Sequence, residues 1–579
     1  MARIKLCLIC WALLAGTPGC DTAASIESET GPGRWPAARP SVTVKRVPLG
    51  TAAELVRDDG GPPEWVFVSP DCRHLAYVER HRDAVRLIFD GVVLGEYESV
   101  DSLHFSPDSL RVAFQAAVGA GTAIVVDGRP GKVYDRVPAG LNFRRTVFSP
   151  DSEHVAYVAI RPNGFGRQFV VCDGKEGRPY SLIYSPSFSP DSQRLAYAAR
   201  RGKGAVAVVD SVEHDTGQRY GFPVFSPDSK EVVWLASHED KVQVMVDGRA
   251  MQGYDDIREV MFSPNSKRLA YAARRGDKWL VVTDGVEGEE FDECGRLCFS
   301  QDSQRLAYRA ARGAEMMMVV DGVAGPGFTD VRQPVFSPDS GGLAYVARRR
   351  EKRIIVVDGT ESQPYDPPPS EGDPESRDDR LVFLYQIHFS ADSRRVGYAA
   401  RRGNSEFVVV DRVEGPAYDA IMTCGPLFSP DSKRVAYAAR RGDRWHVVVD
   451  GVQGPPHRYI LGCGSGGIQF TPDSKHYAYV AEGDDAWCVV VDGKEVGSYD
   501  KSSSRASGAS LVFSPGGKHY AYVVSSTIGP SAVVVDGERI AVDGRMVTGA
   551  CLAFSGPRSL YGLFRNGSSF YHFEVEIAP

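Results

Sequence analysis

Paired arginines recur in one short motif, and these side chains have the clearest capacity to bind a ligand. The motif reads "ARRG" or a close variant, and each copy follows an apolar run that contains a tyrosine. A guanidinium group binds carboxylates and phosphates in a planar, two-pronged geometry. A rim of such groups would therefore bind an anionic partner. The rim predicted from the motif comprises Arg200, Arg201, Arg274, Arg275, Arg348, Arg349, Arg401, Arg402, Arg440 and Arg441.

Aspartates that follow an aromatic residue offer a different explanation for the same arginines. They recur near the end of many copies of the pattern, as Asp135, Asp255, Asp292, Asp366, Asp419 and Asp500. Arginine and aspartate could pair within or between copies simply because the whole pattern repeats. The sequence therefore leaves two interpretations open, a structural pairing and an anion-binding surface.

Two other acidic patterns, "SPDS" and "VDG", predict turns. A dozen similar aspartates are unlike a catalytic carboxylate, which is normally one residue made different from its neighbours. Proline presets the backbone angle of a type I turn, and Asp and Ser side chains bond to exposed amides. Four histidines occupy the position where other copies carry arginine, which favours a structural role for each: His74, His154, His476 and His519.

Sequence motifs of common enzymes and metal sites are absent. There is no Gly-x-Ser-x-Gly, His-Glu-x-x-His, Walker or Rossmann glycine motif. The eight cysteines that follow Cys20 show no disulfide framework, and the closest pair, Cys294 and Cys298, lacks a second pair for zinc. We therefore expect no metal and no cofactor, whereas enzymatic activity stays an open question.

The motifs belong to a unit of about forty residues that occurs thirteen times. Val68 occupies the first position of the first unit, and phenylalanine occupies it in the others. Each unit contains four runs rich in Val, Tyr, Phe and Leu, bounded by Gly, Pro, Asp or Ser, which is typical of short antiparallel strands. The phenylalanines are Phe105, Phe148, Phe188, Phe225, Phe262, Phe299, Phe336, Phe389, Phe428, Phe470, Phe513 and Phe554.

One four-stranded unit cannot bury both of its faces, so the units must stack on one another. The two ends of the chain fit a closed stack. Residues 41–48 form a single strand candidate ahead of the first unit, and the last unit supplies only three strands. Pairing of these two segments would close a ring without an open sheet edge.

The phrase "FSPDS" followed by "RLAY" and "VVVDG" resembles the WD40-like propeller repeat of TolB and related bacterial envelope proteins. The resemblance covers about residues 62–579. It implies an all-β fold of about thirteen four-stranded propeller blades. Because propellers generally have four to eight blades, we expect two β-propellers of six and seven blades, at residues 41–331 and 332–579. Residues 366–380 are predicted to form an acidic, proline-rich loop.

The first twenty residues predict an export signal, with Arg3 and Lys5 ahead of the apolar run "LCLICWALLA". Cys20 lies where a bacterial lipoprotein would be acylated, although Thr17 replaces the usual leucine; ordinary signal cleavage is the alternative. Residues 21–40 are expected to be a flexible tether. The chain is thus predicted to lie in the cell envelope, lipid-anchored and facing the periplasm or the outer surface.

These features favour a non-enzymatic, exported binding or scaffold protein with a protein or glycan partner. The formal net charge of −7 argues against nucleic acid as the partner. The alternative is a propeller enzyme, a lyase or hydrolase with its active site in the central tunnel. The propeller fold hosts both kinds of function and does not decide between them.

Overall fold

The computed structural model describes most of the chain from residue 41 onward. The described residues are 41–51, 65–137, 146–161, 167–184, 186–218, 221–332, 334–367, 386–422, 425–461, 467–500, 511–524, 531–547 and 549–579. They belong to the compact unit Ala38–Pro579. The predicted signal peptide, Cys20 and the tether lie outside the described residues, as does most of the predicted loop 366–380. No helix in the described part of the chain is long and apolar enough to cross a membrane.

All regular structure in the described ranges is β-strand, and the strands form thirteen antiparallel sheets, numbered here in chain order. The predicted fold class and blade number are confirmed. Sheets 1 to 4 consist of β2 (Val66–Val68), β3 (Leu75–His81), β4 (Ala84–Phe89) and β5 (Val92–Tyr97); β6 (Val100–Phe105), β7 (Val112–Val118), β8 (Gly121–Val126) and β9 (Arg129–Pro130); β10 (Thr146–Phe148), β11 (Val155–Ile160), β12 (Gln168–Cys172) and β13 (Lys175–Glu176); β14 (Leu182–Ile183), β15 (Ser187–Phe188), β16 (Leu195–Arg201), β17 (Gly204–Val209) and β18 (Val212–Asp215).

Sheets 5 to 9 follow the same order, and the first strand is interrupted in sheet 8 as it is in sheet 4. They consist of β19 (Val224–Phe225), β20 (Val232–His238), β21 (Lys241–Val246) and β22 (Arg249–Tyr254); β23 (Asp256–Phe262), β24 (Leu269–Arg275), β25 (Lys278–Thr283) and β26 (Val286–Phe291); β27 (Glu293–Phe299), β28 (Leu306–Arg312), β29 (Glu315–Val320) and β30 (Val323–Ala324); β31 (Asp330–Val331), β32 (Val335–Phe336), β33 (Leu343–Arg349), β34 (Lys352–Val357) and β35 (Thr360–Glu361); β36 (His388–Phe389), β37 (Val396–Arg402), β38 (Ser405–Val410) and β39 (Val413–Glu414).

Sheets 10 to 13 complete the series, and the last sheet includes the first strand of the chain. They consist of β40 (Ala420–Ile421), β41 (Leu427–Phe428), β42 (Val435–Arg441), β43 (Arg444–Val449) and β44 (Val452–Gln453); β45 (Tyr459–Ile460), β46 (Gln469–Phe470), β47 (Tyr477–Glu482), β48 (Ala486–Val491) and β49 (Lys494–Asp500); β50 (Val512–Phe513), β51 (Tyr520–Val524), β52 (Ser531–Val535) and β53 (Glu538–Val542); β54 (Arg545–Met546), β55 (Ala553–Phe554), β56 (Ser559–Asn566), β57 (Ser569–Ile577) and β1 (Val42–Thr51).

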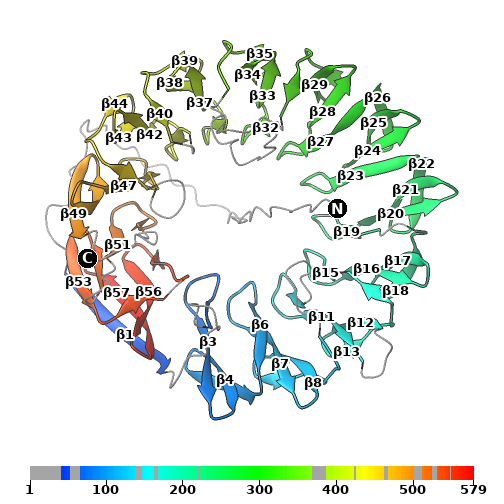
Figure 1. Ribbon diagram of the computed structural model, residues 1–579, viewed down its shortest axis with the longest axis horizontal. Coiled ribbons are helices and arrows are strands. Elements are labelled where there is room, and N and C mark those ends of the chain that lie inside the picture. The colour runs from blue at the N-terminus through cyan, green and yellow to red at the C-terminus, as the bar shows by residue number, and fades with distance from the viewer. Residues whose placement is uncertain are drawn as a thin grey trace. The chain divides into compact units, whose positions relative to one another are not determined.

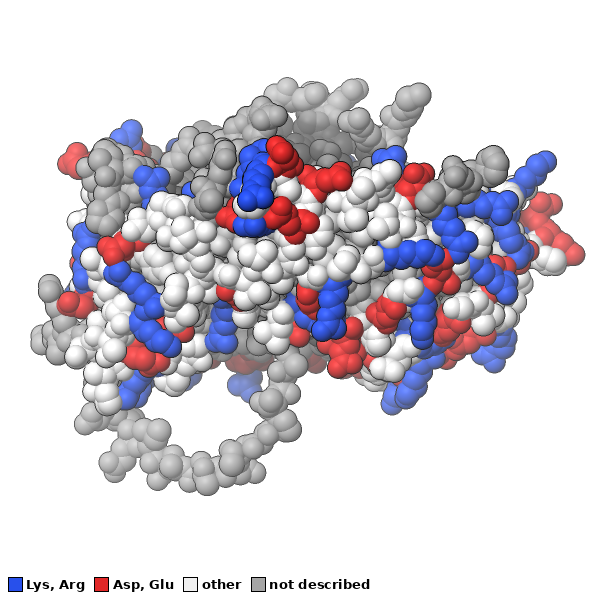
Figure 2. Space-filling model, turned by 90° about the horizontal axis from the view of Figure 1, so that it is seen from below, with Lys and Arg blue, Asp and Glu red and all other residues white. Residues whose placement is uncertain are grey.

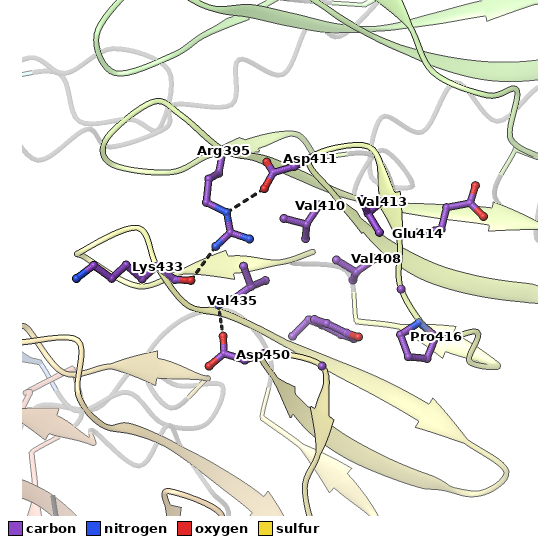
Figure 3. Close-up of a pocket in the computed structure, with 13 residues that line it drawn as sticks. Arg395, Val408, Val410, Asp411, Val413, Glu414, Pro416, Lys433, Val435 and Asp450 are labelled. Atoms are coloured by element: carbon purple, nitrogen blue, oxygen red, sulfur yellow. Dashed lines mark hydrogen bonds and ion pairs between the residues drawn. The ribbon is translucent and has the colours of Figure 1, made fainter. Parts of the chain in front are cut away.

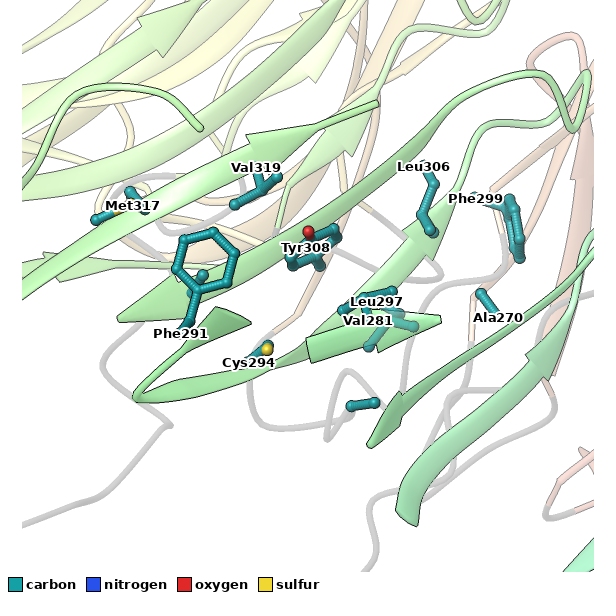
Figure 4. Packing of buried hydrophobic residues seen from close by; sticks show 12 residues of the cluster. Ala270, Val281, Phe291, Cys294, Leu297, Phe299, Leu306, Tyr308, Met317 and Val319 are labelled. Carbon is teal, nitrogen blue, oxygen red and sulfur yellow. The ribbon is translucent and has the colours of Figure 1, made fainter. Parts of the chain in front are cut away.

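The sheets follow one another around a single ring, with the first strand of each sheet toward the middle and the last toward the outside (Figure 1). Apolar side chains fill the space between neighbouring sheets. Between sheets 6 and 7, for example, Phe291 and Val281 pack against Leu297, Tyr308 and Met317; Figure 4 shows this cluster. Because successive residues of a strand face opposite sides, each sheet contributes one set of side chains to each neighbour.

The structure does not show the predicted division into two propellers near residue 331. A continuous core crosses that position, because Met318 and Phe328 from the end of sheet 7 pack against Val331, Leu343 and Tyr345 of sheet 8. The expectation rested on the usual limit of eight blades per ring. Here the thirteen sheets follow one another around one ring instead (Figure 1). The interface at residue 331 is an apolar core like those between the other described sheets.

Ring closure follows the arrangement predicted from the two ends of the chain. Strand β1 pairs with β57 in antiparallel register, with Val44 opposite Val575. Leu49 from β1 also reaches the core between sheets 13 and 1, beside Tyr77 and Phe570. The edge strand of the last sheet therefore comes from the start of the chain, and the prediction of a borrowed strand is confirmed.

A disulfide between Cys72 and Cys551 also joins sheets 1 and 13. The two residues are separated by 479 positions, and their Cα atoms lie 5.9 Å apart, a usual distance for a disulfide. The sequence pattern contains no signal for this pair. The bond covalently fastens the same junction that β1 closes by hydrogen bonding.

The "SPDS" turns connect consecutive sheets from sheet 1 to sheet 11. The backbone N–H of Asp108 donates to Ser152 Oγ in the following turn at 3.0 Å, while Ser106 Oγ donates to Asp108 in the same turn. The equivalent contacts join Asp71 to Ser109, Asp151 to Ser192, Asp191 to Ser229, Asp228 to Ser266, Asn265 to Ser303, Asp302 to Ser340, Asp339 to Ser393, Asp392 to Ser432 and Asp431 to Ser474. These residues are structural, as their repetition predicts.

We predict that the disulfide contributes measurably to stability. Replacing both cysteines, Cys72→Ala with Cys551→Ala, should lower the free energy of unfolding by about 2–5 kcal/mol, because the bond restricts the unfolded chain. Denaturant titrations with and without a reductant provide the measurement and the control. The wild-type protein should lose stability when reduced, whereas the double variant should not respond. Equal stability of both proteins under oxidising conditions would contradict the prediction.

Candidate functional site

The hairpins that carry the "ARRG" motif lie on the same face as the Tyr-Asp linkers. Asp255 Oδ2 accepts a hydrogen bond from the backbone N–H of Gly276, the turn glycine of the hairpin, at 2.5 Å. Gly276 has a φ of 59°, as the first residue of a type II′ turn requires. The same contact joins Asp292 to Gly313, Asp366 to Gly403 and Asp419 to Gly442. The linker aspartates thus lie beside the arginine hairpins, as their recurrence in the sequence suggested. Only the backbone of Asp500 is described.

The second arginine of each motif is largely engaged in the blade structure. Arg402 forms two hydrogen bonds with Glu414 at 2.7 and 3.0 Å, and its guanidinium stacks over the rings of Tyr365 and Phe407. Arg201, Arg275 and Arg349 pair in the same way with Glu213, Glu287 and Glu361. Arg441 stacks over Tyr418 at 5.0 Å, and its blade carries Gln453 at the glutamate position. For these residues, the structural interpretation fits best.

The first arginine of each motif makes fewer side-chain contacts with the described residues than the second. Arg274 and Arg401 donate to the carbonyl oxygens of Gly276 and Gly403 in their own turns, each at 2.9 Å. The side chains of Arg200 and Arg348 are exposed and have no side-chain partner among the described residues. Arg440 Nε is buried without a hydrogen-bond partner in the same part of the chain. The ten predicted rim residues therefore divide into two chemically different sets.

A buried carboxylate, Glu406, lies beside this face and was missed by the sequence analysis. Its side chain accepts a hydrogen bond from the N–H of Ile421 at 2.7 Å. Burial raises the pKa of Glu406, although the hydrogen bond from Ile421 and the charges of Arg401 and Arg440 act in the opposite direction. Gln168 accepts the equivalent bond from Ile183 N–H in sheet 4 at 2.8 Å. Only comparison of aligned repeats could have singled out this glutamate.

Charges of both signs lie side by side on the surface drawn in Figure 2. Lysine and arginine side chains there alternate with aspartate and glutamate, and no large area of one sign appears on that side. Ion pairs between these exposed groups contribute little individually. On this side of the molecule, charge alone marks no binding surface for an anion.

The four repeat histidines occupy the predicted arginine position. His74 Nδ1 lies 2.5 Å from Asp90 Oδ2, and Arg268 Nε contacts Asp284 Oδ2 at 3.0 Å in the same place in sheet 6. The other histidine pairs are His154 with Asp173, His476 with Asp492 and His519 with Asp536. His154 also lies with Asp151 and Glu153 in a group whose potential ligand atoms are within 4.8 Å. Asp151, Glu153 and His154 belong to one "SPDS" turn, and their contacts are the hydrogen bonds that this turn makes in other sheets.

Clefts open between neighbouring blades at the face that carries the "VDG" turns. The cleft between sheets 9 and 10 has a volume of about 510 Å³ and is lined by Val408, Val410, Val435 and Tyr437 (Figure 3). Equivalent residues line a cleft of about 390 Å³ between sheets 7 and 8. Arg395 bridges the first cleft by hydrogen bonds to Asp411 and to the carbonyl of Lys433. The clefts are apolar with a charged border, and the sequence analysis did not predict them.

Comparisons with known proteins give no family assignment. No protein-family model and no curated protein matches the chain. Among solved structures, a eukaryotic initiation factor aligns at 14% identity with a TM-score of 0.28, covering 60% of this chain and 95% of that one. TolB from Acinetobacter baumannii aligns at 13% identity with a TM-score of 0.21, covering 56% and 95%. The Dos1 propeller aligns at 12% identity with a TM-score of 0.25, covering 55% and 92%. These values carry no statement about function.

We predict that the two arginines of a motif differ in their effect on stability. Arg402→Ala should lower the free energy of unfolding by about 1 kcal/mol, because it removes an ion pair and two ring contacts. Arg348→Ala should change it by less than about 0.5 kcal/mol, since its side chain is exposed and has no side-chain partner in the described part of the chain. Urea titrations of both variants make the comparison. Equal losses would show that the first arginine is as structural as the second.

We further predict that Glu406 makes stability depend on pH. Because its folded-state pKa lies above the usual 4.5, protonation favours the folded protein, and this contribution is lost as pH rises through the folded-state pKa. Glu406→Gln keeps the acceptor for Ile421 and removes the charge. The variant should match the wild type below pH 4.5 and exceed its stability at pH 7, measured by urea titration. A variant that is less stable at pH 7 would overturn this assignment.

Proposed function

We propose that this chain is an exported, non-enzymatic binding or scaffold protein of the cell envelope, lipid-anchored through Cys20, whose propeller surface binds an anionic protein or glycan. One observation carries the proposal. The first arginines of the repeated motif lie on one face at blade spacing, and Arg200 and Arg348 among them have no acidic partner within the described residues.

The disulfide supports the exported location. Bonds such as Cys72–Cys551 form and persist in oxidising compartments and are rare in the cytosol. The apolar segment and Cys20 at the start of the sequence agree with this location. The cell envelope is therefore a compartment in which the Cys72–Cys551 disulfide that closes the ring can form.

The two sets of arginines support a binding surface over a purely structural pattern. A structural pattern requires the second arginine, which contacts a glutamate and an aromatic ring in several blades. The first arginine makes no equivalent contact, yet it recurs in five blades as Arg200, Arg274, Arg348, Arg401 and Arg440. These guanidinium groups lie in sheets 4, 6, 8, 9 and 10, a distribution that matches an extended partner with several carboxylates or phosphates.

Charge reversal of the unpaired arginines tests this proposal. Arg200→Glu with Arg348→Glu should abolish capture of the partner from a native envelope extract, because like charges then face the ligand, while the melting temperature stays within a few degrees. Exchange of two exposed lysines for glutamate beside the "SPDS" turns, Lys267→Glu with Lys475→Glu, is the matched control, because it alters the net charge by the same amount.

The captured material decides between the two partner classes. Loss of the captured band after protease treatment indicates a protein, and loss after deglycosylation indicates an anionic glycan. Capture that persists undiminished in the charge-reversed variant would refute the role of these arginines. Turnover of a captured carbohydrate or peptide by the purified chain would instead favour the enzymatic alternative.

A further inference from the structure

The interface between sheets 10 and 11 contains two residues that depart from the repeat. His457 stands where the preceding blade carries Tyr418, at the point where the linker pairs with the third strand. Cys488 lies in β48 and pairs with Ala481 of β47. The equivalent residue of sheet 9 is Phe407, which pairs with Ala400. An imidazole and a thiol thus replace two packing residues at one place.

The two side chains are buried and face one another. His457 Nδ1 lies 3.9 Å from Cys488 Sγ, and His457 Nε2 lies 3.1 Å from the hydroxyl of Tyr479. The Cys488 thiol is also 3.5 Å from the carbonyl oxygen of Ala481. The exposed fractions of His457 and Cys488 are only 6% and 4%. Among the described residues, the weak contact with the Cys488 thiol is therefore the only hydrogen bond of His457 Nδ1.

The hydrogen bond to Tyr479 orients the histidine as metal-binding histidines are oriented. An imidazole that donates its Nε2 hydrogen to the Tyr479 oxygen presents the lone pair of Nδ1 to the sulfur. Ligating histidines almost always hold their second ring nitrogen in such a bond, which fixes both ring orientation and tautomer. The arrangement is thus ready for a ligand between nitrogen and sulfur without a change of rotamer.

A cleft gives access to the pair, and its border is acidic. The cleft has a volume of about 400 Å³, and His457 and Cys488 are among its lining residues with Asp484, Asp485 and Glu495. Asp484 is paired with Arg444 at 2.7 Å. Asp485 and Glu495 have no ion pair among the described residues. Two uncompensated carboxylates at the entrance favour entry of a cation.

We propose that this cleft binds one thiolate-seeking cation, Cu(I), between Cys488 Sγ and His457 Nδ1. With the bond lengths known for zinc, about 2.3 Å to sulfur and about 2.0 Å to imidazole nitrogen, a metal ion would span the 3.9 Å gap at an angle of roughly 130°. This bent angle suits a three-coordinate ion, whose third ligand would be water from the cleft. Thiolate and imidazole suit both copper and zinc. Cu(I) fits better, because two or three ligands suffice for it whereas structural zinc takes four.

Binding exchanges one proton for one metal ion. Cu(I) forms a bond to sulfur and a dative bond to Nδ1, and the thiol proton passes to water in the cleft. No electron is transferred, so copper remains in the +1 state and sulfur remains a thiolate. Affinity should therefore increase with pH, by up to tenfold per pH unit where the thiol is protonated in the free protein.

Competition with bicinchoninate under anaerobic conditions tests the site in the full-length protein. Cys488→Val and His457→Tyr should each lose one equivalent of tightly bound Cu(I) per chain. Val206 in sheet 4 and Tyr418 in the linker after sheet 9 occupy the equivalent positions. Tyr479→Phe should weaken binding by about 10–100-fold. Cys294→Val is the matched control, because Cys294 is a buried thiol without a histidine contact among the described residues, and it should retain the ion.

X-ray absorption of the copper-loaded wild-type protein gives a second readout that needs no variant. Mixed sulfur and nitrogen scattering from a Cu(I) ion of low coordination number is expected. Scattering from sulfur alone, equal loss of copper in Cys294→Val, or retention of copper in both Cys488→Val and His457→Tyr would overturn the proposal. Tighter retention of Zn(II) than of Cu(I) in a parallel competition would overturn the choice of metal.

Discussion

Burial of both faces of every sheet is the constraint on which the rest of this structure depends. A four-stranded sheet with apolar side chains on both sides needs a neighbour on each side. A linear stack would leave two such faces in water, and only a ring has no end. Consecutive sheets are held together by the linkers of the chain, but sheets 13 and 1 are not consecutive. The pairing of β1 with β57 and the Cys72–Cys551 bond join these two sheets.

The features visible in the sequence are those that a single blade determines. The apolar residue at the start of each unit, the turn residues and the single strand candidate at residues 41–48 predict strands, hairpins and closure, because their causes are local or lie near the two ends of the repeat array. The number of rings is different, since it depends on the small angle between neighbours. No single residue encodes that angle, and a core that joins Met318 to Leu343 looks like any other in the sequence.

The candidate site was only partly predictable for a related reason. Repetition identified the arginine motif and the aspartates of the linkers as candidate partners, but it could not separate Arg402, which binds Glu414, from the neighbouring Arg401. That distinction depends on which side of the strand each residue faces. Glu406 and His457 escaped notice because a residue that departs from the repeat is recognisable only once the repeats are aligned position by position. Cys488 is visible in the sequence as a replacement for an apolar residue, but its contact with His457 is not.

Closure by the first and last strands also orders events during synthesis. Strand β1 is among the first segments of the fold to leave the ribosome, and β57 is the last strand. Twelve blades can stack as they emerge, yet the pairing that completes the ring must wait until β57 has emerged as well. Until then, the growing stack ends in an exposed apolar face, which calls for a chaperone or a translocation channel to keep nascent molecules from joining end to end.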